Sequence, residues 1–367
     1  MIGDAALLAG GLVLLVAGAG WLVKGASRLA VALGVTPLVV GLTVVAFGTS
    51  APELAVSVAA AYSGASALSV ANVVGSNIFN ILAILGVSAL AAPLAVDRRL
   101  VRLDVPVMIG ASVLLFVLAA DGSIGMLDGL LLAGLIVAYT GFLVGQARRD
   151  REASGAGAAA EVAGPASARR MALPPNLALI ALGVAALVLG SRFLVLGAVG
   201  LARALGVSEA VIGLTIVAAG TSLPELATSV VAALKGARDI SIGNLVGSNI
   251  FNILSVLGFS GLAAGGRLVV APDILAADLP LMIAAAAVCL PLFRAGYKVT
   301  RGEGAVLTGL YLAYIAWTVM RATSSPALGA FTGIMFDLVF PALIVGLAVM
   351  LIGAVREEEA AARKPGG

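Results

Sequence analysis

Long apolar segments recur along the whole chain, and they limit its possible folds more than any other feature. A helix that crosses a bilayer needs about 20 mostly apolar residues. Because 61% of the 367 residues are apolar and only 11% are charged, the chain cannot cover a soluble surface of this size. The sequence therefore predicts an all-α polytopic membrane protein with about eleven spans, at residues 5–23, 36–61, 67–91, 104–120, 125–145, 174–197, 208–233, 240–263, 274–293, 304–320 and 333–355.

The positions of the basic residues predict the orientation of these spans. Of the 22 Lys and Arg residues, 18 lie in the loops that follow odd-numbered spans. Basic loops favour the cytoplasmic side, so we expect the N-terminus outside and residues 146–173 inside. Residues 1–21 lack the basic start of a cleavable signal and are interpreted as the first span. We expect a multi-pass protein of the cell (inner) membrane.

Missing residue types exclude several classes of protein. The chain has no histidine and a single cysteine, Cys289, which excludes His-dependent proteases, zinc hydrolases and thiolate metal sites. No basic run is interleaved with aromatic residues, so we expect no nucleic-acid partner. We also expect no enzymatic activity, no cofactor and no obligatory protein partner, with the lipid bilayer as the surroundings.

Two segments of the first half recur in the second half. Residues 41–57 match residues 213–229 at 13 of 17 positions, and residues 72–86 match residues 244–258 at 12 of 15. Both pairs have the same offset of 172 residues, without a gap between them. The chain therefore contains an internal duplication.

Each copy contains five predicted spans, so the second copy enters the membrane from the opposite side. Inverted repeats of this kind are typical of secondary transporters, whose substrate site lies near mid-bilayer between the repeats. We expect residues 1–145 to form the first five-helix half, residues 146–173 a cytoplasmic linker, and residues 174–322 the second half. Residues 323–367 then add an eleventh helix and a cytoplasmic tail.

Glu53 and Glu225 occupy equivalent positions of the two copies, deep in apolar stretches. An acid at this depth is unfavourable, and the second, third, seventh and eighth spans contain no Lys or Arg that could neutralise it. Helix capping is the structural alternative. We interpret the two acids as carboxylates that meet near the midplane and are neutralised by a cation.

Pro52 and Pro224 precede the two acids. Proline has no N–H and clashes with the carbonyl four residues back, so each should interrupt its helix and free carbonyls of residues 46–49 and 218–221. Non-helical backbone at membrane depth is tolerated only within protein or beside a wet cavity. Adjacent hydroxyl groups favour an oxygen-lined cation site over a simple packing kink, and they belong to Thr49, Ser50, Thr221 and Ser222.

The following span of each copy carries polar side chains at four-residue steps, which share one helical face. Hydrogen bonds between helices could account for some of them, and this alternative stays open for Asn72, Asn77, Asn244 and Asn249. A role in the site is favoured for Ser76, Asn80, Ser248 and Asn252. Such an all-oxygen set suits Ca²⁺ and Na⁺. Four other acids are predicted to cap helix starts, namely Asp104, Asp128, Asp278 and Glu303.

The duplicated motifs, G-T-S-x-P-E-L followed by G-S-N-I-x-N, resemble the repeats of the calcium/cation antiporter superfamily, in its prokaryotic sodium/calcium exchanger branch. The resemblance implies exchange of Ca²⁺ for Na⁺ by alternating access. It implies that Glu53 and Glu225 are central Ca²⁺ ligands assisted by Thr49 and Thr221. The implied Na⁺ ligands are Ser50, Ser76, Ser222, Ser248 and the carbonyls of Ala46 and Ala218, and Asn80 and Asn252 complete the cluster. The first and sixth spans are implied to slide past the other helices.

Other functions are weighed against this one. The main alternative is a Ca²⁺/H⁺ antiporter, because two close carboxylates can hold protons in place of Na⁺. Some relatives, including the potassium-dependent branch of the family, have Asp at the position of Asn252. Here both equivalent positions, Asn80 and Asn252, are Asn, so the site has two carboxylates and potassium co-transport is less favoured. A passive channel is disfavoured by inverted repeats around broken helices. An intramembrane protease is also disfavoured. The chain lacks the histidine that a serine-type enzyme generally needs, and it lacks the Gly-x-Gly-Asp motif of the paired-aspartate type.

Overall fold

The computed structural model describes residues 2–153, 166–265 and 267–363, and these are almost entirely helical. Besides α-helices, the described residues form several π-helical segments and one 3₁₀ turn, η4, all labelled η. The first half comprises α1 (Ile2–Leu33), α2 (Pro37–Val40), η1 (Gly41–Val45), α3 (Ala46–Thr49), α4 (Ala51–Tyr62), α5 (Ser66–Phe79), η2 (Asn80–Ile84), α6 (Leu85–Ala91), β1 (Leu94–Ala95), η3 (Leu100–Asp104), α7 (Val105–Leu118), η4 (Ala119–Asp121), β2 (Ser123–Gly125) and α8 (Met126–Ala153).

The second half and the C-terminal region are built in the same manner. They comprise α10 (Ala166–Ala204), α11 (Glu209–Ile212), η5 (Gly213–Val217), α12 (Ala218–Gly220), α13 (Leu223–Leu234), α14 (Arg238–Phe251), η6 (Asn252–Leu257), α15 (Gly258–Ala263), β3 (Arg267–Val269), η7 (Ile274–Asp278), α16 (Leu279–Arg294), β4 (Lys298–Val299), α17 (Arg301–Ala322), α18 (Leu328–Ile334), η8 (Met335–Val339) and α19 (Phe340–Arg363).

The described residues contain nine helices that are long and apolar enough to cross a membrane. A tenth span results if Pro37–Thr49 and Ala51–Tyr62, which are bent by 46° at their junction, are taken together. The segment predicted as a span at residues 208–233 is divided among α11, η5, α12 and α13, and α13 alone is too short to cross. The protein is therefore a multi-pass membrane protein, as the apolar segments predicted.

The predicted linker at residues 146–173 has helix at both of its ends, because α8 continues to Ala153 and α10 begins at Ala166. Its middle, residues 154–165, lies outside the described residues. The predicted eleventh helix begins at Leu328, five residues before the predicted start at 333.

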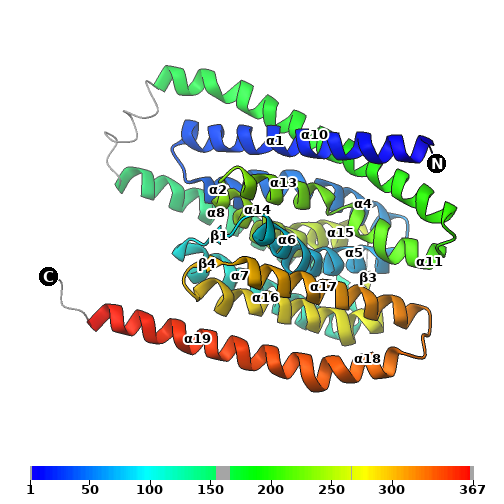
Figure 1. The fold of residues 1–367 in the computed structure, drawn as a ribbon. Helices are drawn as coiled ribbons and strands as arrows, with labels where there is room; N and C mark the ends of the chain where they lie inside the picture. Colours follow the sequence, from blue (N-terminus) through cyan, green and yellow to red (C-terminus); the bar gives the residue numbers. More distant parts are fainter. Residues whose placement is uncertain (1, 154–165, 266, 364–367) are drawn as a thin grey trace.

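The two long helices α1 and α10 lie side by side along one edge of the molecule (Figure 1). Along α1, Gly11, Gly18 and Gly25 follow at steps of seven residues and face α10. A Cβ atom at Gly18 would lie 2.8 Å from the Gly183 carbonyl oxygen and 2.9 Å from the Leu187 amide nitrogen. The helices are thus close enough that only a hydrogen atom fits between their backbones.

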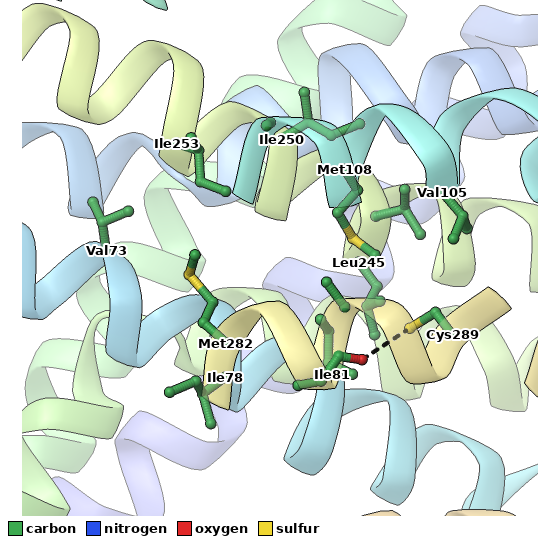
Figure 2. Packing of buried hydrophobic residues seen from close by; sticks show 14 of the residues in the cluster. Val73, Ile78, Ile81, Val105, Met108, Leu245, Ile250, Ile253, Met282 and Cys289 are labelled. Carbon is green, nitrogen blue, oxygen red and sulfur yellow. Dashed lines mark hydrogen bonds between the residues drawn. The ribbon is translucent and has the colours of Figure 1, made fainter. Parts of the chain in front are cut away.

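The centre of the molecule lies between this edge and the opposite edge, which α18 and α19 form (Figure 1). Here the two spans that carry the second motif, Ser66–Ala91 and Arg238–Ala263, are each 83% buried over their most apolar window. Their apolar side chains interdigitate with Met108 of α7 and Met282 of α16 (Figure 2). Cys289 is part of this core and its Sγ donates to the Ala285 carbonyl, so it packs as a small apolar residue.

Two short β-ladders connect the halves, which an all-α prediction does not include. β1 pairs antiparallel with β4, with Leu94 opposite Val299. β2 pairs antiparallel with β3, with Ile124 opposite Leu268. In both ladders a loop of the first half is hydrogen-bonded to a loop of the second half.

The four acids predicted as helix caps divide into two groups. Glu303 forms a reciprocal capping box with Thr300, and Asp128 accepts the Gly125 amide at 2.7 Å, as expected at helix starts. The prediction for Asp104 and Asp278 is wrong. Each is the last residue of a π-helical segment within a continuous helix, where the neighbouring N–H groups already have partners. Asp104 instead accepts a hydrogen bond from Tyr139, and Asp278 accepts one from Tyr314.

Tyr139→Phe is expected to destabilise the protein. Asp104 is fully buried, and the Tyr139 hydroxyl, at 2.8 Å, is the one hydrogen-bond donor to its carboxyl within the described residues. Leaving a buried carboxyl without a donor costs about 1–3 kcal/mol, which thermal unfolding in detergent micelles would detect. Tyr311→Phe is the matched control, and an equal loss of stability in both variants would contradict the assignment.

Candidate ion-binding site

Both glutamates stand directly after a helix break. Helix α3 ends at Thr49 and α4 begins at Ala51, and the backbone of Ser50 between them has φ −82° and ψ 5°. In the second half, Ser222 has φ −91° and ψ 6° before α13 begins at Leu223. Each proline occupies the first turn of the new helix, where its missing N–H is tolerated. The predicted interruptions are therefore present in both copies.

Each glutamate is fully buried and receives a hydrogen bond from the opposite half. The Ser222 hydroxyl donates to Oε1 of Glu53 at 2.9 Å, and the Ser50 hydroxyl donates to Oε1 of Glu225 at 3.0 Å. The exposed fractions of the two glutamates are 0% and 1%. The arrangement brings two acids that are 172 residues apart in the sequence into one buried cluster.

The two threonines also cross between the halves. Thr49 Oγ1 donates to Oδ1 of Asn244 at 3.0 Å, and Thr221 Oγ1 donates to Oδ1 of Asn72 at 3.3 Å. The same side chains lie against the glutamates, Thr49 beside Glu225 and Thr221 beside Glu53.

The second motif lines the same region. Ser76 shares a hydrogen bond of 3.0 Å with Ser222. Asn252 Nδ2 donates to Asn77 Oδ1 at 3.1 Å, and Asn77 Nδ2 donates to the Asn249 carbonyl at 3.2 Å. Asn80 is 1% exposed and belongs with these residues to the buried interior.

Several buried oxygens of these residues have no hydrogen-bond partner within the described residues. Buried polar atoms are almost always paired, so a cluster of unpaired oxygens indicates a group that binds there. The unpaired oxygens in this region are Glu53 Oε2, Glu225 Oε2, Asn80 Oδ1, Asn252 Oδ1, Asn249 Oδ1 and Ser248 Oγ. All of them can accept a contact from a hard cation.

The backbone carbonyls differ between the halves. The prediction that the Ala46 carbonyl is freed is wrong, because it accepts the Ser50 amide at 3.0 Å and the Thr49 hydroxyl at 3.4 Å. Pro52 removes only the bond to Gly48, four residues before it. In the second half the Ser222 amide donates to Ala219 at 3.2 Å, not to Ala218. When the single Thr49 hydroxyl hydrogen is donated to Asn244, one lone pair of the Ala46 carbonyl oxygen remains for a further ligand.

Ser57 and Ser229 were not recognised from the sequence, although they close the first duplicated segment. Asn72 Nδ2 donates to Ser57 Oγ and Asn244 Nδ2 donates to Ser229 Oγ, each at 3.0 Å. Their identity in both copies was the signal that could have identified them. Within the described residues no three His, Cys, Asp or Glu side chains gather, so any cation here depends on two carboxylates supplemented by neutral oxygens.

Comparisons with known proteins agree with this architecture. A family profile described as "Sodium/calcium exchanger protein" matches residues 4–145 and 175–320. The chain is 38% identical to "Inner membrane protein YrbG" of Escherichia coli, over 89% of this chain and 99% of the relative. It is 36% identical to "Sodium/calcium exchanger MaX1" of Methanosarcina acetivorans, over 83% and 95%.

Among solved structures, the sodium–calcium exchanger NCX_Mj, soaked with Na⁺ and without Ca²⁺, superposes with a TM-score of 0.73 at 31% identity. The superposition covers 86% of this chain and 98% of the exchanger. With helices broken at both glutamates, a buried oxygen cluster between the halves and matches over nearly the full length, the chain belongs to the sodium/calcium exchanger family of membrane cation antiporters.

Proposed function

We propose that this protein exchanges Na⁺ for Ca²⁺ across the membrane by alternating access at the buried oxygen cluster. The observation that carries the proposal is the pair of unpaired carboxylate oxygens, Glu53 Oε2 and Glu225 Oε2, beside further unpaired amide and hydroxyl oxygens. Two carboxylates balance one Ca²⁺ or two Na⁺, so the two cations can compete for one site. A site that binds either cation but not both at once couples their movements.

The proposed ligands follow from this cluster. Glu53 and Glu225 bind Ca²⁺ with help from Thr49 and Thr221, and Asn80 and Asn252 complete the middle of the site. Na⁺ is bound by the four serines and by two backbone carbonyls, supplied by Ser50, Ser76, Ser222, Ser248, Ala46 and Ala218. The inverted arrangement of two five-helix halves, with eleven spans and the N-terminus outside, belongs to the same proposal.

Alternating access requires a part of the molecule that moves. The tight contact of α1 with α10 supports a movement of these two helices together past the remaining helices. The ladders β1–β4 and β2–β3 connect loops of the remaining helices across the halves, so those helices would stay together while the pair slides.

Ca²⁺ uptake into proteoliposomes tests the proposal. Vesicles that contain the purified protein and are loaded with Na⁺ are expected to take up Ca²⁺ at least about 10-fold faster than vesicles loaded with K⁺. The reason is that outward Na⁺ flow supplies the driving force, and each tenfold Na⁺ gradient provides about 1.4 kcal/mol per ion. A pH gradient without Na⁺ is the third condition. Uptake driven equally well by the pH gradient would identify a Ca²⁺/H⁺ antiporter instead, since two close carboxylates can also exchange protons.

A further inference from the structure

Each site threonine is connected to an asparagine and then to a serine of the opposite half. In one relay Thr49 donates to Asn244, which donates to Ser229. In the other, Thr221 donates to Asn72, which donates to Ser57. The two relays are related by the internal duplication, and they cross the site in opposite directions.

Both amide groups are held in one orientation. Because Nδ2 of Asn244 donates to Ser229 Oγ at 3.0 Å, its Oδ1 must face Thr49. Ser229 is itself held, since its carbonyl accepts the Ser241 hydroxyl at 2.8 Å. Thr49, Asn244 and Ser229 are all 0% exposed, whereas Thr221 and Asn72 of the other relay are half-buried. The asparagine therefore presents a fixed acceptor to the threonine.

The Thr49 hydroxyl has a single hydrogen and three acceptors beside it. They are the Asn244 amide oxygen at 3.0 Å, the Ala46 carbonyl at 3.4 Å and the carboxyl of Glu225. Without the amide, the charged carboxyl is the stronger of the two remaining acceptors. A hydrogen bond to the carboxylate would neutralise part of the charge that attracts a cation. A hydrogen bond to the amide leaves the carboxylate oxygens open to the cation.

We propose that Asn244 and Asn72 are positioning residues that hold the hydroxyl hydrogens of Thr49 and Thr221 away from the two carboxylates. They need not touch the cation themselves. Without the amide oxygen, the hydroxyl turns to the carboxylate, and the cation has to displace that hydrogen bond when it binds. The inference rests on the proposed function of the carboxylates as cation ligands, and it assigns Ser229 and Ser57 the part of fixing the two amides.

A double-mutant cycle tests this role. In Asn244→Leu, the Ca²⁺ concentration for half-maximal uptake is expected to rise about 10-fold, because Ca²⁺ must then displace a charge-assisted hydrogen bond from Thr49 to the carboxylate. The maximal uptake rate should stay within about 3-fold of the wild-type rate. In a Thr49→Val background, which has no hydroxyl to orient, Asn244→Leu should add no further increase. The pair Asn72→Leu and Thr221→Val should behave in the same way.

Two further variants separate positioning from folding. Ser229→Ala removes only the group that fixes the amide, and a rise of about 3-fold in the same Ca²⁺ concentration is expected. Tyr139→Phe, which removes a buried hydrogen bond between helices elsewhere, should leave that concentration unchanged. Equal effects of Asn244→Leu with and without the Thr49 hydroxyl would overturn the proposal, as would a lowered maximal rate at an unchanged Ca²⁺ concentration.

The cycle is measured with whichever counter-ion wild-type uptake requires, and equilibrium Ca²⁺ binding to the purified proteins is measured alongside. If Ca²⁺ uptake occurs but does not require Na⁺, the proposed counter-ion is overturned, and the double-mutant cycle can still be interpreted. Wild-type protein that neither binds nor transports Ca²⁺ would overturn the proposed function and this inference together.

Discussion

The double variant Glu53→Gln, Glu225→Gln is expected to abolish Ca²⁺ uptake under every driving condition. Glutamine keeps the shape and the hydrogen-bond acceptor for Ser222 or Ser50 but removes the charge. Each carboxylate that is lost should weaken Ca²⁺ binding by about 100-fold, because a charged ligand contributes about 3 kcal/mol. Either single variant should therefore be nearly inactive at micromolar Ca²⁺, and its residual binding can be measured at equilibrium.

Glu303→Gln is the matched control for these variants. Glu303 is also at the start of a helix, but it is half-buried and forms a capping box with Thr300, a role that glutamine can fill. Uptake by this control should equal that of the wild type. Retained uptake in the double variant would mean that the cation binds elsewhere and that the two buried carboxylates serve the fold.

The second large effect is expected from Gly18→Val. The new Cβ would lie 2.8 Å from the Gly183 carbonyl oxygen and 3.0 Å from the Ala186 Cβ, so α1 and α10 must separate. Overpacking of this kind costs about 1–3 kcal/mol, and the proposed sliding of the two helices as one unit should be lost with it. We expect the transport rate to fall about 10-fold or more while equilibrium Ca²⁺ binding stays near the wild-type value, because no proposed ligand lies on either helix.

Gly110→Val provides the comparison for this change. Gly110 also lies in an apolar helix, α7, but nothing comes within 4 Å of a Cβ atom there. This variant should transport normally. If Gly18→Val transported as fast as Gly110→Val, the close contact of α1 with α10 would have no part in the movement.

The sequence predicted the central features of the site because they depend on local chemistry. A proline in an apolar stretch removes a helix hydrogen bond and favours an interruption, so the breaks before Glu53 and Glu225 could be placed where α4 and α13 begin. Other prolines of the chain, Pro174, Pro175 and Pro291, lie inside helices. The duplication then indicated that the two acids belong together, although it could not show that each carboxyl would be hydrogen-bonded by a serine of the other half. That pairing depends on how the helices cross, which no local pattern contains.

The errors have the same origin. Asp104 was assigned as a cap because a short polar loop precedes an apolar run, but η3 extends the helix through it and Tyr139 of α8 supplies the hydrogen bond. The ladders were missed because strands of two or three residues have no recognisable alternation. The helical start of α10 at Ala166 was hidden by its Arg-rich and Pro-containing sequence. The ladders and the Asp104 hydrogen bond both depend on contacts between segments distant in the chain.

The hydrogen bonds that cross between the halves also determine how the protein can be made. Glu53 is synthesised 169 residues before Ser222, and Thr49 is synthesised 195 residues before Asn244. Until the second half is made, the Glu53 carboxyl lacks the Ser222 hydroxyl that donates to it in the complete protein. Neither half alone contains all the hydrogen bonds of its own glutamate. The duplication of the chain has produced two halves that mature only as one unit.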